Sequence, residues 1–170
     1  MIVELTPEEI QICTLLAGWR KAANRKAQPY DRIKADGLDP SYVEREGVLS
    51  ELAFCKLVNA YPDQVFTIGH RSAKNLEDDG DVTVNGVCID VKTTTPQQGR
   101  LCAVSTNPSI DLVVMMVGEK GYYRFAGGLP AEDLYQKNRW GLPKNMSRPC
   151  FSAVQQELMT PKQIFDLLGQ

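Results

Sequence analysis

The chain has 170 residues, of which 43% are hydrophobic and 24% are charged, and these proportions predict one soluble globular domain with its own core. The formal net charge of −2 argues weakly against a nucleic-acid partner, and no stretch reaches the roughly 20 apolar residues that a membrane span needs. We therefore expect no membrane partner. The first residues also lack a basic segment followed by an apolar one, so no signal peptide is predicted.

The cysteines and the single histidine make several kinds of functional site improbable. The five cysteines form no CxxC pair, which argues against a zinc site and a disulfide framework, and reduced thiols are typical of the cytoplasm. The single histidine, His70, has no flanking nucleophile, so a Ser-His or Cys-His mechanism has little support. The sequence thus predicts a cytoplasmic location.

Two helices are predicted in the first third of the chain. Thr6-Pro7, followed by two glutamates, is typical of a capped helix start, and apolar residues then recur at helical spacing to about residue 27. Asp39-Pro40 opens a second helix in the same way, and that helix is expected to end near residue 60.

Strands and turns dominate the remainder. Strands are predicted at 64–70, within a hairpin at 79–95, and at 101–105, 111–117 and 122–127. The strand at 111–117 is apolar on both faces and is therefore expected to be central. Residues 127–150 predict mostly loop, with a short helix at 130–137, and residues 160–169 predict a C-terminal helix. Helices interspersed with hairpins predict an α/β fold, with a central mixed β-sheet flanked by helices.

The hairpin carries the most chemical information. Asn85-Gly86 between two β-branched runs predicts a two-residue turn, which would place Val82 opposite Ile89 and Asp81 opposite Asp90. Lys92 lies two residues beyond Asp90 and would point to the same side. The valines of the hairpin and Ile89 would lie on the other side, which must be buried. A single pairing register would therefore bury the apolar side chains and bring the acidic ones together.

Acidic side chains placed in this way suggest a cation site. Two carboxylates directly opposite each other on paired strands lie roughly 5 Å apart at Cβ and repel each other. A divalent cation reverses that repulsion, because hard oxygen ligands suit Mg²⁺ or Mn²⁺. Lys92 could hold a water molecule or neutralise charge that develops on a phosphate. The alternative is an exposed face on which these charges only solvate the sheet.

Basic residues gather in two segments on either side of an acidic one. Residues 20–34 contain six basic residues and one acid, and residues 137–148 contain four basic residues and no acid, with Trp140 among them. A basic rim around an acidic centre suits a polyanion, although a solvated surface explains each segment about equally well. The residues predicted from these segments to contact nucleic acid are Arg20, Lys21, Arg25, Lys26, Lys137, Arg139 and Lys144. Arg71 and Lys74, at the mouth of the hairpin, join that set.

The stretch "DGDVTVNGVCIDVKTTT" resembles the core motif of the PD-(D/E)XK nuclease superfamily, which has the restriction-endonuclease-like fold. By that resemblance the two acids of the motif fall on Asp81 and Asp90, and its lysine falls on Lys92. Thr94 resembles the hydroxyl residue that often follows the lysine and is added to the predicted nucleic-acid contacts. Gly80 stands where the family name has proline, and Asp79 is an alternative to Asp81 as the first acid.

Many members of this family also present a glutamate from a preceding helix, often as G-x-x-x-E-x-A. Gly47, Glu51 and Ala53 match that pattern. Glu51 falls within an apolar stripe of the predicted helix, where a carboxylate needs a partner. A surface position for Glu51 is the alternative, and Glu44 is the fallback glutamate.

The resemblance implies a Mg²⁺- or Mn²⁺-dependent nuclease that hydrolyses phosphodiester bonds, most simply a DNA endonuclease. Asp81 and Asp90 would bind the metal with the carbonyl oxygen of Val91. Glu51 would bind a second metal or orient a water, and Lys92 would position the attacking water and help to deprotonate it. A nuclease core of this size would suit a phage or mobile-element enzyme, a junction resolvase, a repair nuclease or a restriction subunit, and a homodimer would cut two strands.

Two other classes of function remain open at this point. The first is a catalytically inactive nucleic-acid-binding or assembly protein on the same fold. The second is a metal-dependent phosphohydrolase that acts on a small substrate in a closed pocket.

Overall fold

The computed structural model describes residues 1–27, 39–61, 80–144, 146 and 148–170. Its helices and strands, in chain order, are β1 (Ile2–Glu4), α1 (Pro7–Ala27), α2 (Pro40–Leu57), β2 (Val82–Val84), β3 (Val87–Thr94), β4 (Leu101–Ala103), β5 (Leu112–Glu119), β6 (Tyr122–Pro130), α3 (Ala131–Leu134), η2 (Lys137–Arg139), β7 (Trp140–Gly141), β8 (Cys150–Ala153), η3 (Gln155–Glu157) and α4 (Pro161–Leu167). The strand predicted at 64–70 lies outside the described residues.

Side-chain caps start both long helices where the sequence predicts them. At α1 the Thr6 and Glu9 side chains each accept a hydrogen bond from the other residue's backbone N–H. At α2 the Asp39 carboxylate accepts a hydrogen bond from the backbone N–H of Ser41, and Pro40 fills the first helical position. The capped starts therefore confirm the two predicted helices.

A mixed five-stranded sheet forms the centre of the fold. Its strand order is β1-β6-β5-β3-β2, in which β3 and β5 are parallel and the other pairs are antiparallel. The first seven residues of β5 are buried, which confirms its predicted central place. A mixed sheet with helices confirms the α/β class predicted from the sequence.

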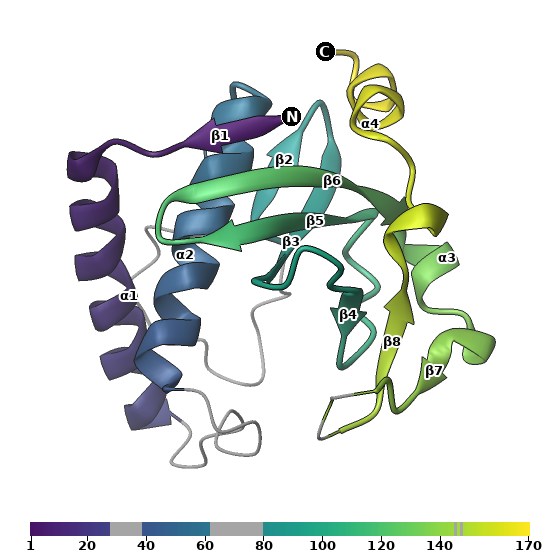
Figure 1. Cartoon of the computed structure of the whole chain (residues 1–170), viewed down its shortest axis with the longest axis horizontal. Helices are drawn as coiled ribbons and strands as arrows, with labels where there is room; N and C mark the ends of the chain where they lie inside the picture. Colours follow the sequence, from purple (N-terminus) through teal and green to yellow (C-terminus); the bar gives the residue numbers. More distant parts are fainter. Residues whose placement is uncertain (28–38, 62–79, 145, 147) are drawn as a thin grey trace.

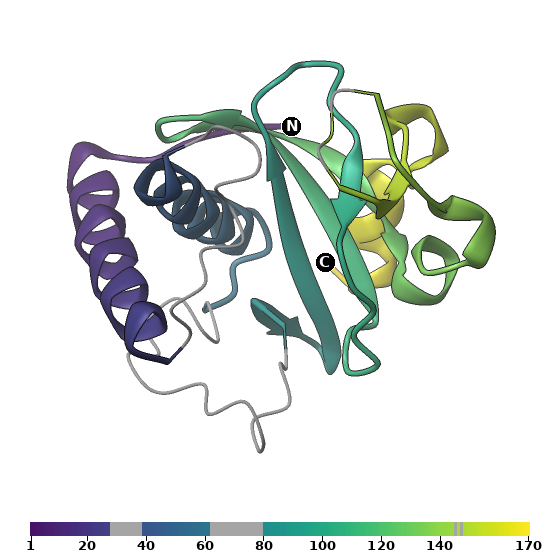
Figure 2. The same cartoon turned by 90° about the horizontal axis from the view of Figure 1, so that it is seen from below.

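Different layers cover the two faces of this sheet (Figures 1 and 2). Helices α1 and α2 pack on one face around a core that includes Phe54, Ile89 and Phe125. A second core, which includes Leu101, Val113 and Met115, lies on the opposite face beneath α3 and a small sheet of order β4-β8-β7. The small sheet was not predicted, because Trp140–Gly141 and Cys150–Ala153 fall in or next to the segment interpreted as loop.

The register of β3 decides which side chains face which layer. Ile89 and Val91 pair with Leu112 and Val114, which belong to the core beneath the helices, whereas Asp90 and Lys92 pair with residues of the other core. Asp90 and Lys92 therefore point towards the small sheet. Among the described helices, none has the length and apolarity needed to cross a membrane.

Candidate active site

A pocket with a volume of about 500 Å³ lies at the end of the β2–β3 hairpin that is remote from its turn. All four residues predicted to be catalytic line this pocket, and Arg20 joins them from α1. These charged lining residues are Arg20, Glu51, Asp81, Asp90 and Lys92. The fold therefore gathers residues that are separated by more than 70 positions in the chain.

The short length of β2 explains how side chains from both faces of the sheet reach one pocket. The β2–β3 ladder ends at the Val82–Ile89 pair, so the later part of β3 has β5 as its partner among the described strands. Within the described residues, this edge of β3 has no strand partner beyond Ile89, and the Asp81 side chain bonds to it at Val91. Glu51 reaches this edge from the helix layer, and Asp90 and Lys92 reach it from the other face.

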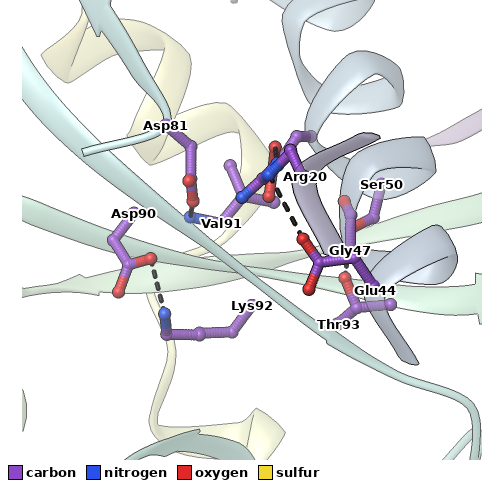
Figure 3. Close-up of polar contacts among 10 residues, drawn as sticks. Arg20, Glu44, Gly47, Ser50, Asp81, Asp90, Val91, Lys92 and Thr93 are labelled. Atoms are coloured by element: carbon purple, nitrogen blue, oxygen red, sulfur yellow. Dashed lines mark hydrogen bonds and ion pairs between the residues drawn. The ribbon is translucent and has the colours of Figure 1, made fainter. Parts of the chain in front are cut away.

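Asp90 and Lys92 form the closest charged pair in this pocket. The Lys92 ammonium lies 2.6 Å from Asp90 Oδ1 (Figure 3). Burial alone would lower the pKa of Lys92, but the charge of Asp90 and its hydrogen bond outweigh burial, and the pKa is raised. Lys92 is therefore a protonated donor, which suits aiming a water molecule and not removing its proton.

Asp81 departs from the predicted pairing. Instead of facing Asp90 in the ladder, its backbone N–H donates to the Ile89 carbonyl at 2.8 Å, and its carboxylate accepts the Val91 N–H at 2.7 Å (Figure 3). Asp81 therefore continues the hairpin through its side chain. Burial raises its pKa well above the ordinary value of 3.8, with further contributions from the negative charges of Glu51 and Asp90.

Gly80 supplies the physical reason for that departure. Its φ is +87°, a conformation that L-residues other than glycine rarely adopt, and a Cβ there would lie 2.8 Å from the Ile89 carbonyl oxygen. Proline, whose φ is fixed near −65°, could not take this conformation. The backbone conformation before Asp81 therefore requires a glycine at the position where the PD-(D/E)XK motif has proline.

Glu51 is buried, as its place in an apolar stripe predicts, and its partner is a cation. Arg20 Nη1 donates to Glu51 Oε2 at 2.9 Å. Arg20 Nε lies 3.3 Å from Glu44 Oε1, and both of these residues are labelled in Figure 3. The latter contact is an ion pair without good hydrogen-bond geometry, since Glu44 Oε1 has no hydrogen-bond partner. Burial raises the pKa of Glu51, and Arg20 opposes that rise.

Arg20 was predicted to contact nucleic acid, and the structure pairs it with Glu51, which lines the pocket, and with Glu44. A signal was present in the sequence, because Arg20 continues the helical stripe of Cys13, Leu16 and Ala17, all of which are buried. A cation on a buried stripe requires an acidic partner. Cys102, which lines the pocket from the small sheet, was missed because the β4–β8 pairing that places it is non-local. Tyr135, at the end of α3, was also missed.

The pocket offers carboxylate oxygens, which are the ligand atoms that a hard divalent cation prefers. Glu51, Asp81 and Asp90 offer carboxylate oxygens to one pocket, and the raised pKa values of Glu51 and Asp81 mark a place that favours added positive charge. Each carboxylate nevertheless has a partner within the chain, and the described residues contain no group of three or more His, Cys, Asp or Glu side chains that could hold a metal ion as they stand.

The remaining predicted nucleic-acid contacts fall in several places. Lys21 hydrogen-bonds Ser41 between α1 and α2, and Thr94 lies against Gly99. Arg139 pairs with Glu157 at 3.1 Å, whereas Lys137 lines a second pocket and Lys144 is exposed. Arg71, Lys74 and the side chains of Arg25 and Lys26 lie outside the part that the structure describes.

No family model, no curated protein and no solved structure matched this chain in the comparisons made with each. The function is therefore inferred from the residues of the pocket and from the hairpin motif.

Proposed function

We propose that this protein is a metal-dependent nuclease with a PD-(D/E)XK-like site and a restriction-endonuclease-like fold, and that it hydrolyses phosphodiester bonds in DNA. One observation carries the proposal: Glu51, Asp81, Asp90 and Lys92, chosen from the sequence, line one pocket. Three carboxylates and one ammonium converge on one pocket, which is the combination of groups that the proposed metal-dependent chemistry requires.

The proposed role of each residue follows from its contacts. Asp81, Asp90 and Glu51 would hold Mg²⁺ or Mn²⁺, which when bound would polarise the scissile phosphate and stabilise the leaving oxygen. Asp90 also holds Lys92 in place through the 2.6 Å ion pair. The Lys92 ammonium would donate a hydrogen bond to the attacking water or neutralise charge developing on the phosphate. Its raised pKa keeps it in that form.

The Asp81 bond to the Val91 N–H gives this part of the site its rigidity. Because the carboxylate replaces a strand-to-strand hydrogen bond, the position of Asp81 is fixed relative to Asp90, the residue before Val91. A fixed position matters here, because catalytic groups must be held close to the productive geometry, and Asp81 precedes β2 and relies on this bond to hold it.

A non-catalytic nucleic-acid-binding protein is the second candidate, and one observation favours it. Each of the three carboxylates already has a partner in the chain, to Arg20, Val91 or Lys92, and these contacts satisfy the pocket without a metal. Such a protein would bind DNA through its basic segments and leave it intact.

Cleavage assays separate the candidates. We expect the protein to cut plasmid, single-stranded or branched DNA with Mg²⁺ or Mn²⁺ and not with EDTA, and Asp90→Asn and Lys92→Met to lower the rate at least about 100-fold. Lys162→Met and Asp166→Asn are matched controls, because they remove a 3.1 Å lysine–aspartate pair on the exposed face of α4. DNA binding without cutting under either metal would support the second candidate. Hydrolysis of small phosphate esters alone would indicate a phosphohydrolase.

A further inference from the structure

A second pocket, with a volume of about 470 Å³, adjoins the candidate active site. It shares Val104 and Ser105 with the acidic pocket, so a ligand can extend from one pocket into the other. The residues that line the second pocket are Val104, Ser105, Thr106, Lys137, Trp140 and Phe151. None of them has a role in the proposed chemistry.

Three aromatic rings connect the two pockets. Trp140 lies 4.8 Å from Phe151 between ring centroids, and Phe151 lies 5.5 Å from Tyr135, which lines the acidic pocket. Trp140 is also paired with Phe151 across the β7–β8 ladder, which holds its ring in place. The second pocket therefore offers a fixed aromatic surface beside the site of the proposed cleavage.

This aromatic surface is exposed and lies next to positive charge. Trp140 is 47% exposed and Val104 is 50% exposed, so the small sheet leaves them unburied. Lys137 lines the same pocket, and residues 137–148 contain four basic residues and no acid. A ligand that complements both features has a flat apolar ring attached to a negatively charged backbone. A nucleotide in a strand has both properties.

We propose that this pocket binds one unpaired nucleobase of a DNA strand, stacked on Trp140, and that the substrate therefore has a single-stranded region next to the scissile phosphate. The identity of the strand rests on the proposed nuclease function. A base inside a duplex is paired and stacked and cannot reach the ring, so the pocket selects single-stranded or branched DNA over an intact duplex.

The two tryptophans of the chain allow a direct test. Trp19, on α1, is 52% exposed and remote in sequence from the pocket, so Trp19→Phe leaves Trp140 as the reporter and Trp140→Phe leaves Trp19. Titrations in EDTA use an oligothymidylate of about ten nucleotides, an abasic strand of equal length and charge, and a blunt-ended duplex without unpaired bases. We expect the oligothymidylate to quench Trp140 fluorescence and leave Trp19 unchanged, and the abasic strand and the duplex to quench neither.

Affinity measurements complete the test. Trp140→Leu should weaken oligothymidylate binding about tenfold, because stacking on an aromatic ring contributes that much or more per base, and should leave duplex binding within twofold. Trp140→Phe, which keeps an aromatic ring, should retain most of the affinity and guards against a folding defect in the leucine variant. Trp19→Leu is the matched control and should bind like the unmodified protein.

The outcomes distinguish this inference from the nuclease proposal. Equal quenching by the abasic strand, equal loss of duplex binding, or concentration-dependent quenching of Trp140 without DNA would overturn the base-binding pocket. If the oligothymidylate quenches Trp140 but neither metal supports cutting, base binding by the second pocket is supported and the nuclease proposal fails. If cutting occurs and the fluorescence of Trp140 does not respond to any strand, the nuclease proposal is supported and base binding by the second pocket is contradicted.

Discussion

Helix α2 buries two glutamates five residues apart, and their surroundings differ sharply. Glu46 is 5% exposed and Glu51 is 6% exposed. Glu46 accepts hydrogen bonds from the Tyr123 hydroxyl at 2.6 Å and the Lys120 N–H at 2.7 Å, and it pairs with Arg45 at 2.9 Å. Glu51 faces the pocket, and its described hydrogen-bond donor is Arg20.

The difference separates a structural carboxylate from one available for chemistry. Glu46 ties α2 to the β5–β6 turn, and its partners leave it little capacity for a ligand. Glu51 has a raised pKa caused by burial, which means that its negative charge is not fully stabilised by the chain. Equal burial therefore does not imply an equal role, and the hydrogen-bond partners decide it.

Glu51→Gln tests whether Glu51 takes part in the chemistry, and the expected change in cleavage rate is the largest effect predicted from this comparison. The substitution keeps the shape of the side chain but removes the charge, so we expect cleavage with Mg²⁺ to fall about 100-fold. The free energy of unfolding should change little, because the removal of a buried charge with a raised pKa is offset by the loss of the Arg20 ion pair, while Glu44 stays 3.3 Å from Arg20. Glu46→Gln is the matched control, and it should keep the cleavage rate per folded molecule. A larger rate loss in Glu46→Gln would reverse the assignment.

Glu46→Ala tests the structural half. It leaves the buried Tyr123 hydroxyl and the Lys120 N–H without their acceptor, so we expect the free energy of unfolding to fall by about 2–4 kcal/mol. Urea denaturation followed by circular dichroism measures this loss. Tyr123→Phe, which removes one of the two donors, should lose less. A Glu46→Ala variant as stable as the unmodified protein would show that the network contributes little.

Asp81→Asn has the smallest expected effect on the free energy of unfolding, and that effect depends on pH. Because burial raises the pKa of Asp81, the folded state binds the proton more tightly than the unfolded state does. The free energy of unfolding therefore falls as pH rises from about 4 through the raised pKa, and it stays at the lower value above that. The amide of asparagine can still accept the Val91 N–H without carrying a charge.

We therefore expect Asp81→Asn to be about 1 kcal/mol more stable than the unmodified protein at pH 7.5 and to differ less from it at pH 4. Urea denaturation at both pH values measures the difference. An Asp81→Asn variant that is less stable at both would mean that the Val91 contact needs the full carboxylate charge.

Local rules predicted the parts of the site that depend on neighbouring residues. The Asn85-Gly86 turn has positive φ at both positions, and it sets the predicted register from Val84–Val87 to Val82–Ile89. The face shared by Asp90 and Lys92 follows from that register and the strand period of two. Helical periodicity likewise placed Glu51 among buried residues.

Parts of the site that depend on distant segments or on unusual backbone conformations were not predicted. The position of Asp81 depends on the positive φ of Gly80, which an assumption of regular strand geometry cannot include. The second wall of the pocket depends on β4 pairing with β8, about 50 residues later in the chain. The Arg20–Glu51 pair joins two helices whose packing depends on the core that they share with the sheet, and not on either helix alone.

The central proposal is that the carboxylates lining the pocket bind a divalent cation, and calorimetric titration with Mn²⁺ tests it most directly. We predict saturable binding by the unmodified protein that Asp81→Asn and Asp90→Asn each weaken at least about tenfold, while Glu46→Gln binds normally. Absence of Mn²⁺ binding, or binding that is equal in all four proteins, would contradict the account.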